Sequence, residues 1–376
     1  MKEKKYMELQ QHKKIIISGG GTGGHIFPAI SVANALRKID PETEILFVGA
    51  EGRMEMEKIP SAGYKIIGLP VEGIKRSLSL KNFDVILKLL KSLKIAKKII
   101  REFMPDVVVG VGGYASGPVL WQAGRMGIPT LIQEQNSYAG VTNKLLAKRA
   151  STICVAYNGM DRYFPAGKII KTGNPVRQNF DNLESIKNEA LTYFNLKTDS
   201  PVILVLGGSL GAGSINKSLS ENIDMFRDSG CQWLWQTGKY YFENVNALVS
   251  VSCCENISVQ AFINRMDFAY AAADIIVSRA GAGTISELCL VGKPVILIPS
   301  PNVAEDHQTK NAMALSDRNA AVMVPDDQAV KMLAGEAIKL INDKSKRAIL
   351  SENILKMADR EADIRIAEEV LKLAGK

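Results

Sequence analysis

The chain has 376 residues, of which 46% are hydrophobic and 23% are charged, a composition typical of a soluble globular enzyme. This length exceeds one ordinary hydrophobic core and predicts two domains. The five cysteines lack the spacing of a zinc site and their number is odd, so we expect a reduced, cytosolic setting and no bound metal. The first twelve residues are polar, so we expect no secretion signal.

The net charge of +8 is concentrated in one segment. Residues 75–101 contain nine Lys or Arg and one acid, an excess equal to the net charge of the whole chain. A local basic surface predicts an anionic partner, which could be lipid headgroups, nucleic acid or a phosphorylated substrate.

Short β-branched runs alternate with amphipathic stretches along the first half. This alternation predicts a parallel sheet covered by helices on both faces. The uncharged run 107–124 contains several glycines and a proline, so we assign it to strand, loop and helix rather than to a membrane span. The expected strands are 14–18, 45–49, 107–111, 129–133 and 152–156, with helices at 28–38 and 82–103.

The pattern restarts after a polar connector at 172–200. Residues 201–216 form a strand, a glycine-rich turn and a helix, and further strands are expected at 233–237, 257–262, 275–278, 294–299 and 321–325. The tail 342–376 is expected to be helical. The predicted fold class is α/β, with two doubly wound Rossmann-like domains facing across a cleft. We assign 13–178, completed by a helix at 357–376, to the first domain and 179–356 to the second.

The first glycine-rich loop reads GGGTGG from Gly19 to Gly24 and is followed by His25. Such a loop after a strand exposes backbone N–H groups at a helix start and favours an anion. A tight turn without a ligand is the plainer alternative. A nicotinamide site is another, because Glu51 follows the second strand, but it explains neither His25 nor the second glycine-rich loop. His25 could act as a general base or a hydrogen-bond donor, or could merely start the helix.

Two more loops follow strand ends in the first half. Residues 112–118 and 134–140 should bring Tyr114, Glu134 and Asn136 near the first loop. Glu134 is a second candidate base, or a partner that orients the first, and Asn136 offers a donor and an acceptor to a polyhydroxyl substrate. Ordinary turn chemistry is the alternative for each.

In the second half, residues 207–213 repeat the anion-loop design, with Ser209 as a hydroxyl donor. Thr284 and Glu287 match a capping box, so Glu287 could simply cap a helix. Alternatively, Glu287 accepts the hydroxyls of a ribose while the helix N-terminus holds a diphosphate. Gln308 could bind sugar hydroxyls or lie in a solvated helix start.

The basic segment predicts a surface helix. Ile86, Leu89, Leu90, Leu93 and Ile100 share one face, and lysines lie opposite. Leu78 and Phe83 precede or begin the helix, and Leu87, Ile95 and Ile99 interrupt its polar side. A normal amphipathic helix with a solvated lysine face is the plainer alternative. Apolar residues among Lys88, Lys91 and Lys94 favour docking on an anionic bilayer. Nucleic acid is less favoured, because aromatic interleaving is sparse.

Seven strings, in this order and spacing, together resemble the MurG family of bacterial peptidoglycan N-acetylglucosaminyltransferases. They are GGGTGGHIFPA (19–29), GGYASGP (112–118), EQNSYAG (134–140), TGNPVR (172–177), GGSLGA (207–212), RAGAGTISE (279–287) and DHQTKNA (306–312). The resemblance implies a GT-B fold and inverting transfer from UDP-N-acetylglucosamine to the 4-hydroxyl of undecaprenyl-diphospho-N-acetylmuramoyl-pentapeptide (lipid I), giving lipid II. It also implies a peripheral enzyme on the cytoplasmic face of the inner membrane, with other cell-wall synthesis proteins among its partners.

The resemblance also implies residue roles. His25 is its favoured base, and Gly20, Gly21 and Tyr114 are assigned to the acceptor. The residues assigned to the donor are Thr22, Gly23, Gly24, Asn136, Arg177, Ser209, Ile263, Ala282, Gly283, Thr284, Ile285, Ser286, Glu287 and Gln308. Neither a cofactor nor a metal is expected, because a helix N-terminus with Ser209 and Arg177 could stabilise the leaving diphosphate. One departure is Gln133, where the family often has histidine. A glycolipid synthase or a UDP-sugar epimerase is the alternative within the same fold.

Overall fold

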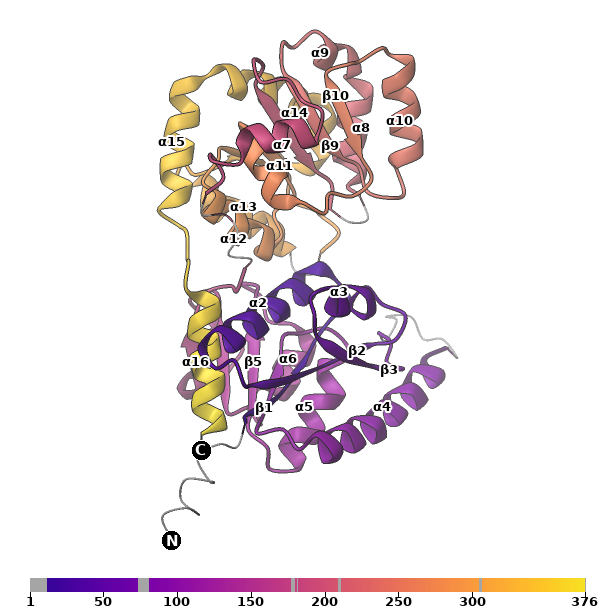
Figure 1. The fold of residues 1–376 in the computed structure, drawn as a ribbon, viewed down its shortest axis with the longest axis vertical. Coiled ribbons are helices and arrows are strands. Elements are labelled where there is room, and N and C mark those ends of the chain that lie inside the picture. The colour runs from indigo at the N-terminus through magenta and orange to yellow at the C-terminus, as the bar shows by residue number, and fades with distance from the viewer. Residues whose placement is uncertain are drawn as a thin grey trace. The chain divides into compact units, whose positions relative to one another are not determined.

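The computed structural model describes residues 12–73, 81–176, 180, 182–208, 211–303 and 306–375, with side chains of the helix that begins at 81 described from 84. The chain divides into two compact units (Figure 1). Unit 1 comprises residues 1–177 and 361–376, and unit 2 comprises residues 178–360.

Unit 1 is built on a seven-stranded parallel sheet in the order β3-β2-β1-β4-β5-β6-β7. Its middle strands are buried on both faces, as their continuous apolar runs predict. Ile16 of β1 points into one core and Ile15 and Ile17 into the other, so helices cover both faces. The strands are β1 (Lys14–Ser18), β2 (Glu44–Ala50), β3 (Lys65–Leu69), β4 (Val107–Gly110), β5 (Thr130–Glu134), β6 (Thr152–Val155) and β7 (Ile169–Lys171).

Two groups of helices cover this sheet. One face packs against α4, α5 and α6, and the other packs against α2, α3 and the C-terminal α16. Helix α16 lies beside α2 (Figure 1), and Arg365 ties it to the sheet by donating to the Thr172 carbonyl at 2.8 Å. The helices are α2 (Gly23–Ile39), α3 (Glu55–Ser61), α4 (Lys81–Phe103), α5 (Ser116–Arg125), α6 (Val141–Leu146) and α16 (Ala362–Ala374), with short 3₁₀ turns at Met160–Arg162 and Ala166–Lys168.

Unit 2 has a six-stranded parallel sheet in the order β10-β9-β8-β11-β12-β13. Its largest core side chains are Trp233 and Trp235 of β9. The strands are β8 (Val202–Leu206), β9 (Gln232–Gln236), β10 (Ile257–Gln260), β11 (Ile275–Ser278), β12 (Val295–Leu297) and β13 (Val322–Met323). The helices are α7 (Lys187–Tyr193), α8 (Gly213–Glu221), α9 (Ile223–Arg227), α10 (Phe242–Val251), α11 (Met266–Ala272), α12 (Ala282–Val291), α13 (His307–Ser316), α14 (Ala329–Asn342) and α15 (Lys344–Leu355), with a 3₁₀ turn at Asp326–Gln328.

Every strand expected from the sequence is present, but some boundaries differ. The first helix begins at Gly23, not at Pro28, and Pro28 lies inside it, where its missing N–H leaves the Gly24 carbonyl without its usual helical donor. The helical tail is two helices, α15 in unit 2 and α16 in unit 1. Residues 107–124 divide into β4, a loop and most of α5. In the described part of the chain, no helix combines the length and the apolar character that a membrane span requires.

Candidate active site

The candidate loops lie at the carboxyl edges of the two sheets, where the strand order reverses. In unit 1 the reversal is between β1 and β4, so the loops that start at Gly19 and at Val111 are neighbours. In unit 2 it is between β8 and β11. The described residues 207–208 and 211–212 follow β8, and the loop at 279–281 follows β11. Open α/β sheets bind their ligands at this kind of position.

Glycine allows the two loops of unit 1 to touch. A Cβ on Gly113 would come within 2.4 Å of the Gly20 carbonyl oxygen, and one on Gly19 within 2.2 Å of a Val111 methyl group. Gly113 also has a φ of +86°, which favours glycine. The packing therefore brings Gly20 and Gly21 next to Gly112, Gly113 and the half-exposed Tyr114 that follows them.

The N-terminus of α2 is open to an anion. Its N-cap residue, Thr22, has an extended backbone, and its side chain makes no capping hydrogen bond. The first turn contains no acidic residue. Gly23 and Gly24 occupy the first two helical positions. Their backbone N–H groups and the helix dipole favour a negatively charged oxygen there.

His25 is half-buried and its imidazole is oriented by the glycine-rich loop. Its Nδ1 lies 3.1 Å from the Gly20 carbonyl oxygen. A carbonyl can only accept, so the neutral ring carries its proton on Nδ1 and presents Nε2 as an acceptor. Burial lowers the pKa of His25, an effect that the Gly20 carbonyl, Glu134 and Glu55 partly oppose. The imidazole is therefore unprotonated at neutral pH, as a general base requires.

Glu134 is buried and saturated with donors. One carboxylate oxygen accepts from the Asn136 backbone N–H at 3.1 Å and side-chain amide at 3.3 Å. The other accepts from the Gly140 N–H and the Asn143 amide, both at 2.9 Å. These four hydrogen bonds shape the loop that carries Asn136, which favours a structural role for Glu134 over proton transfer.

Gln133 lies inside the sheet rather than at its edge. Its side chain is fully buried and donates to Asn174 at 3.4 Å. The side-chain amide of Gln135 donates to Gln133 Oε1 and to the Val111 backbone carbonyl. The departure from histidine at position 133 therefore changes a buried amide network and leaves His25 in place.

Sequence reasoning missed Glu55, which lies under the glycine-rich loop. It is fully buried at the start of α3, and its Oε2 accepts from the Gly21 N–H at 2.9 Å while its Oε1 accepts from the Ala50 N–H at 3.0 Å. Its side chain fills space left by Gly20 and Gly49, where a Cβ would come within 2.1 and 2.6 Å of it. The only sequence signal was indirect: Glu55 follows β2, which neighbours β1.

In unit 2, the helices that follow β8 and β11 also have open starts. Neither α8, with Ala212 at its N-cap, nor α12, with Gly281, has a side-chain cap or an acid in its first turn. The predicted capping box is wrong, because the helix begins upstream of Thr284. Glu287 lies in the second turn of α12, where the Tyr270 hydroxyl donates to its Oε2 at 3.3 Å.

The remaining donor candidates of unit 2 lie around the same edge. Ala282, Gly283, Thr284, Ile285 and Ser286 form the start of α12. The Ile263 N–H donates to Gln236 Oε1 at 3.0 Å. A nucleobase could therefore donate a hydrogen bond to the Ile263 backbone carbonyl without breaking that bond. Gln308, in the first turn of α13, accepts from the Ser300 N–H at 2.9 Å. Arg177 and Ser209 lie outside the described residues.

Arg279, which follows β11, is part of a polar cluster that the sequence did not reveal. It pairs with Asp326, and its Nη2 lies 3.0 Å from the Ser214 hydroxyl oxygen at the start of α8. Asp326 is thus occupied by a guanidinium. Among the described residues, no group of three or more His, Cys, Asp or Glu is placed to hold a metal ion.

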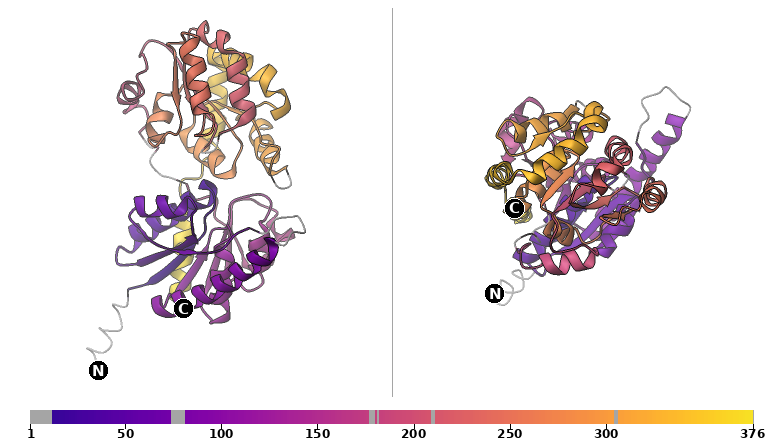
Figure 2. Two further views of the ribbon diagram at one scale, coloured as in Figure 1. Left: turned by 90° about the vertical axis from the view of Figure 1, so that its right-hand side faces the viewer. Right: turned by 90° about the horizontal axis from the view of Figure 1, so that it is seen from above.

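Helix α4 presents an apolar surface, and its predicted faces need correction. Ile99, expected on the polar side, is buried, whereas Ile86 and Leu90, expected on one apolar face with Ile100, are 51% and 52% exposed. Leu87 and Leu89 are exposed too, and the first turns of α4 extend away from the sheet (Figure 2). The core of the sheet contacts the later turns of α4, and among the described apolar residues of its first turns only Val85 is buried.

The charges on α4 differ in availability. Lys91 and Lys94 are exposed. Lys88 pairs with Glu72 at 2.8 Å and with Asp84 at 2.9 Å, so two carboxylates compensate its charge. Leu78 and the side chain of Phe83 lie outside the described residues.

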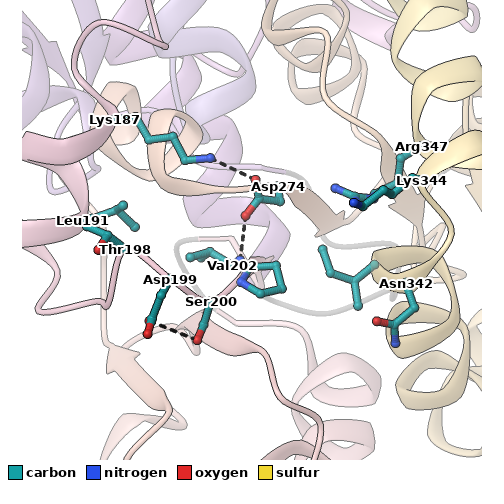
Figure 3. Close-up of a pocket in the computed structure, with 12 residues that line it drawn as sticks. Lys187, Leu191, Thr198, Asp199, Ser200, Val202, Asp274, Asn342, Lys344 and Arg347 are labelled. Atoms are coloured by element: carbon teal, nitrogen blue, oxygen red, sulfur yellow. Dashed lines mark hydrogen bonds and ion pairs between the residues drawn. The ribbon is translucent and has the colours of Figure 1, made fainter.

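A pocket of about 410 Å³ lies at the other, amino edge of the unit 2 sheet (Figure 3). Lys187 reaches Asp274 at 3.0 Å, and Asp274 also accepts from the Val202 N–H. The pocket contains none of the residues singled out from the sequence. Asp274 serves there to tie α7 to the start of β8.

Two family models match the chain. Residues 15–155 match the glycosyltransferase family 28 N-terminal domain, and residues 202–366 match the family's C-terminal domain. The chain belongs to glycosyltransferase family 28. The two family 28 domains fall within units 1 and 2, apart from the last residues of the second match. Family membership supports a UDP-sugar glycosyltransferase rather than a nicotinamide-dependent enzyme.

The chain is similar over its whole length to curated family 28 proteins. A Parabacteroides distasonis protein is 57% identical over 96% of this chain and 99% of its own, and one from Cytophaga hutchinsonii is 53% identical over 98% of each. Both are named UDP-N-acetylglucosamine–N-acetylmuramyl-(pentapeptide) pyrophosphoryl-undecaprenol N-acetylglucosamine transferase.

Solved structures support the same two-domain GT-B architecture. The crystal structure of Acinetobacter baumannii MurG matches with a TM-score of 0.71 at 27% identity, covering 96% of this chain and 99% of that one. The UDP-GlcNAc 2-epimerase of Neisseria meningitidis matches with a TM-score of 0.67 at 17% identity, covering 96% of this chain and all of that one. The epimerase shares the fold alone.

Proposed function

We propose that this protein transfers N-acetylglucosamine, with inversion, from UDP-N-acetylglucosamine to the 4-hydroxyl of undecaprenyl-diphospho-N-acetylmuramoyl-pentapeptide. The observation that carries the proposal is a 57% identity across almost the full length of a protein named for this transfer. A neutral imidazole beside an open helix N-terminus supports it chemically.

Unit 2 holds the donor in this proposal. The start of α12 supplies backbone N–H groups to the diphosphate, and its dipole stabilises the charge that develops on the leaving UDP. Glu287 accepts from the ribose hydroxyls, Ile263 contacts the uracil and Gln308 binds the sugar. The family resemblance assigns Arg177 and Ser209, which lie outside the described residues, to the diphosphate. The absence of acid in the first turns of α8 and α12 supports this assignment.

Unit 1 holds the acceptor and the base. The loop at Gly20 and Gly21, with Tyr114, contacts the acceptor, while Thr22, Gly23, Gly24 and Asn136 contact the donor sugar. Nε2 of His25 takes the proton of the acceptor 4-hydroxyl as that oxygen bonds to C1 of the sugar. The C1–O bond to the diphosphate breaks on the opposite face, which inverts the configuration and releases UDP.

We assign the base to His25 rather than to Glu134. His25 presents Nε2, whereas both oxygens of Glu134 already accept two hydrogen bonds each. The lowered pKa of His25 keeps the imidazole ready to accept a proton at neutral pH.

An anionic membrane surface is the proposed location, on the cytoplasmic face of the inner membrane where a lipid-linked acceptor would be found. The exposed Ile86, Leu87, Leu89 and Leu90 would enter the headgroup region. Lys91 and Lys94 would bind anionic headgroups, worth about 1 kcal/mol each. Lipid II is a peptidoglycan precursor, so loss of the enzyme would affect cell shape and division.

A radiolabel transfer assay tests the proposal. Sugar-labelled UDP-N-acetylglucosamine and a short-chain lipid I analogue are incubated with the protein and a chelator, and a labelled disaccharide-lipid is expected. His25→Gln should lower kcat by about 10²- to 10⁴-fold with little change in donor affinity. Donor epimerised in the absence of acceptor, with no disaccharide, would instead identify an epimerase.

A further inference from the structure

The peptide group between Gly20 and Gly21 is hydrogen-bonded on both sides. Its N–H, from Gly21, donates to Glu55 Oε2 at 2.9 Å, and its C=O, from Gly20, accepts from His25 Nδ1 at 3.1 Å. A carboxylate is therefore connected to the imidazole through one peptide plane. The other oxygen of Glu55 is fixed by the Ala50 N–H at the end of β2.

We infer that Glu55 is a positioning residue that acts on His25 through this peptide group, and we call the arrangement the Glu55 relay. It deepens the proposed function, because it rests on His25 being the base. The carboxylate orients the peptide plane, and the plane in turn holds the proton on Nδ1 and leaves Nε2 to accept the acceptor proton.

The relay does the work of a carboxylate bonded directly to a catalytic histidine. Such a partner fixes the tautomer and the ring orientation. Hydrogen bonds in series polarise one another, so a carboxylate on the N–H strengthens the carbonyl as an acceptor. Because the anion is one peptide removed from the ring, it does not compete for the Nδ1 proton.

The packing leaves little freedom for this arrangement. A Cβ on Gly20 would come within 2.1 Å of Glu55 Oε1, so only glycine lets the carboxylate sit beneath the loop. Gly20 and Gly21 have φ values of +155° and +86°. A carboxylate accepts from both N–H groups, whereas a glutamine would turn its amide nitrogen toward one of them.

The charge of Glu55 also affects the pKa of His25. The groups that bear on the His25 titration are Glu134 and Glu55, both of which raise its pKa against the larger lowering by burial. Removing the charge of Glu55 therefore lowers the pKa of His25 further. The acidic limb of kcat/KM, where the base becomes protonated, must move to lower pH.

Kinetics of Glu55→Gln provide the first test. We expect kcat to fall by about 10- to 100-fold, the loss of one hydrogen bond to a charged group. KM for the donor should change less than about threefold, and the acidic limb should move to lower pH. The matched control is Glu57→Gln, on the same helix but exposed, which should leave all three unchanged. Equal losses in kcat and donor affinity with an unmoved acidic limb would overturn the relay.

Nitrogen-15 spectra of labelled histidine provide a second test that needs no turnover. The chain has three histidines, and a His25→Gln sample identifies the His25 signals. Wild-type His25 should be the Nδ1–H tautomer when neutral, and Glu55→Gln should mix the tautomers. An Nε2–H tautomer in the wild-type protein would refute the relay even if Glu55→Gln fails to fold. Absent transfer activity with the expected spectra would refute the proposed function. The effect of Glu55 on the His25 tautomer would then stand without its catalytic role.

Discussion

The substitution Glu134→Gln tests whether the Glu134 carboxylate has a structural role or acts as the catalytic base. Each oxygen of Glu134 accepts two hydrogen bonds, so an amide nitrogen in place of one oxygen leaves two donors facing a donor. The amide would turn its nitrogen toward Asn136, the half-exposed partner that can swing to solvent. The Asn136 backbone N–H is then the buried donor left unpaired, and the expected cost is about 1–3 kcal/mol.

Differential scanning calorimetry and steady-state kinetics provide the assay. A loss of about 1–3 kcal/mol should lower the unfolding temperature of unit 1 by roughly 2–12 °C. The displaced Asn136 should raise KM for the donor. The acidic limb of the pH profile should move to lower pH, because Glu134 raises the pKa of His25 and the variant removes that charge. An unfolding temperature within about 1 °C of wild type, combined with a 10³-fold loss of kcat, would refute this reasoning and assign the base to Glu134.

Three further predictions follow from the described contacts. Gly113→Ala should destabilise unit 1 by about 2–4 kcal/mol in urea unfolding, because its Cβ meets the Gly20 carbonyl oxygen at 2.4 Å. Gly127→Ala, with a φ of +77° but open space, should cost only about 1–2 kcal/mol. Replacing Lys91 and Lys94 by glutamine should weaken binding to phosphatidylglycerol vesicles by about 30-fold at low salt, whereas the ion-paired Lys88→Gln should have a smaller effect. Burial raises the pKa of the Cys154 and Cys289 thiols to about 12, so at pH 8 a thiol reagent should label the exposed Cys253 first.

Most of the sheet framework could be predicted because its strands are continuous apolar runs. Strands β3 and β7 were missed for a physical reason: both are edge strands, with fewer fully buried positions than the centre. The wrong faces of α4 have a related cause, since periodicity gives the apolar stripe but not how much of the helix lies over the core.

The candidate loops could be predicted from glycine and from strand ends, but the groups that hold them could not. Glu55 stands in MEMEKIP, which gives no sign of a buried carboxylate. Arg279 and Asp326 are separated by 47 residues, and only the sheet topology brings them together. Pairing between distant segments is decided by three-dimensional packing, which a local pattern does not encode.

The structure divides the glycines of each loop into two classes. Gly20 and Gly211 are needed for packing, because a Cβ would meet Glu55 in the first case and Tyr241 and a backbone carbonyl in the second. Gly21 and Gly208 have positive φ and open space within 4 Å of a Cβ, so packing alone does not explain them. Each loop thus combines a glycine that holds it against its own sheet with one that leaves its outer face bare. A bare backbone is what a diphosphate requires to approach the N–H groups closely. The glycines in these loops therefore meet two demands of the fold, close packing at Gly20 and Gly211 and a positive φ at Gly21 and Gly208, and they leave the outer face of each loop bare.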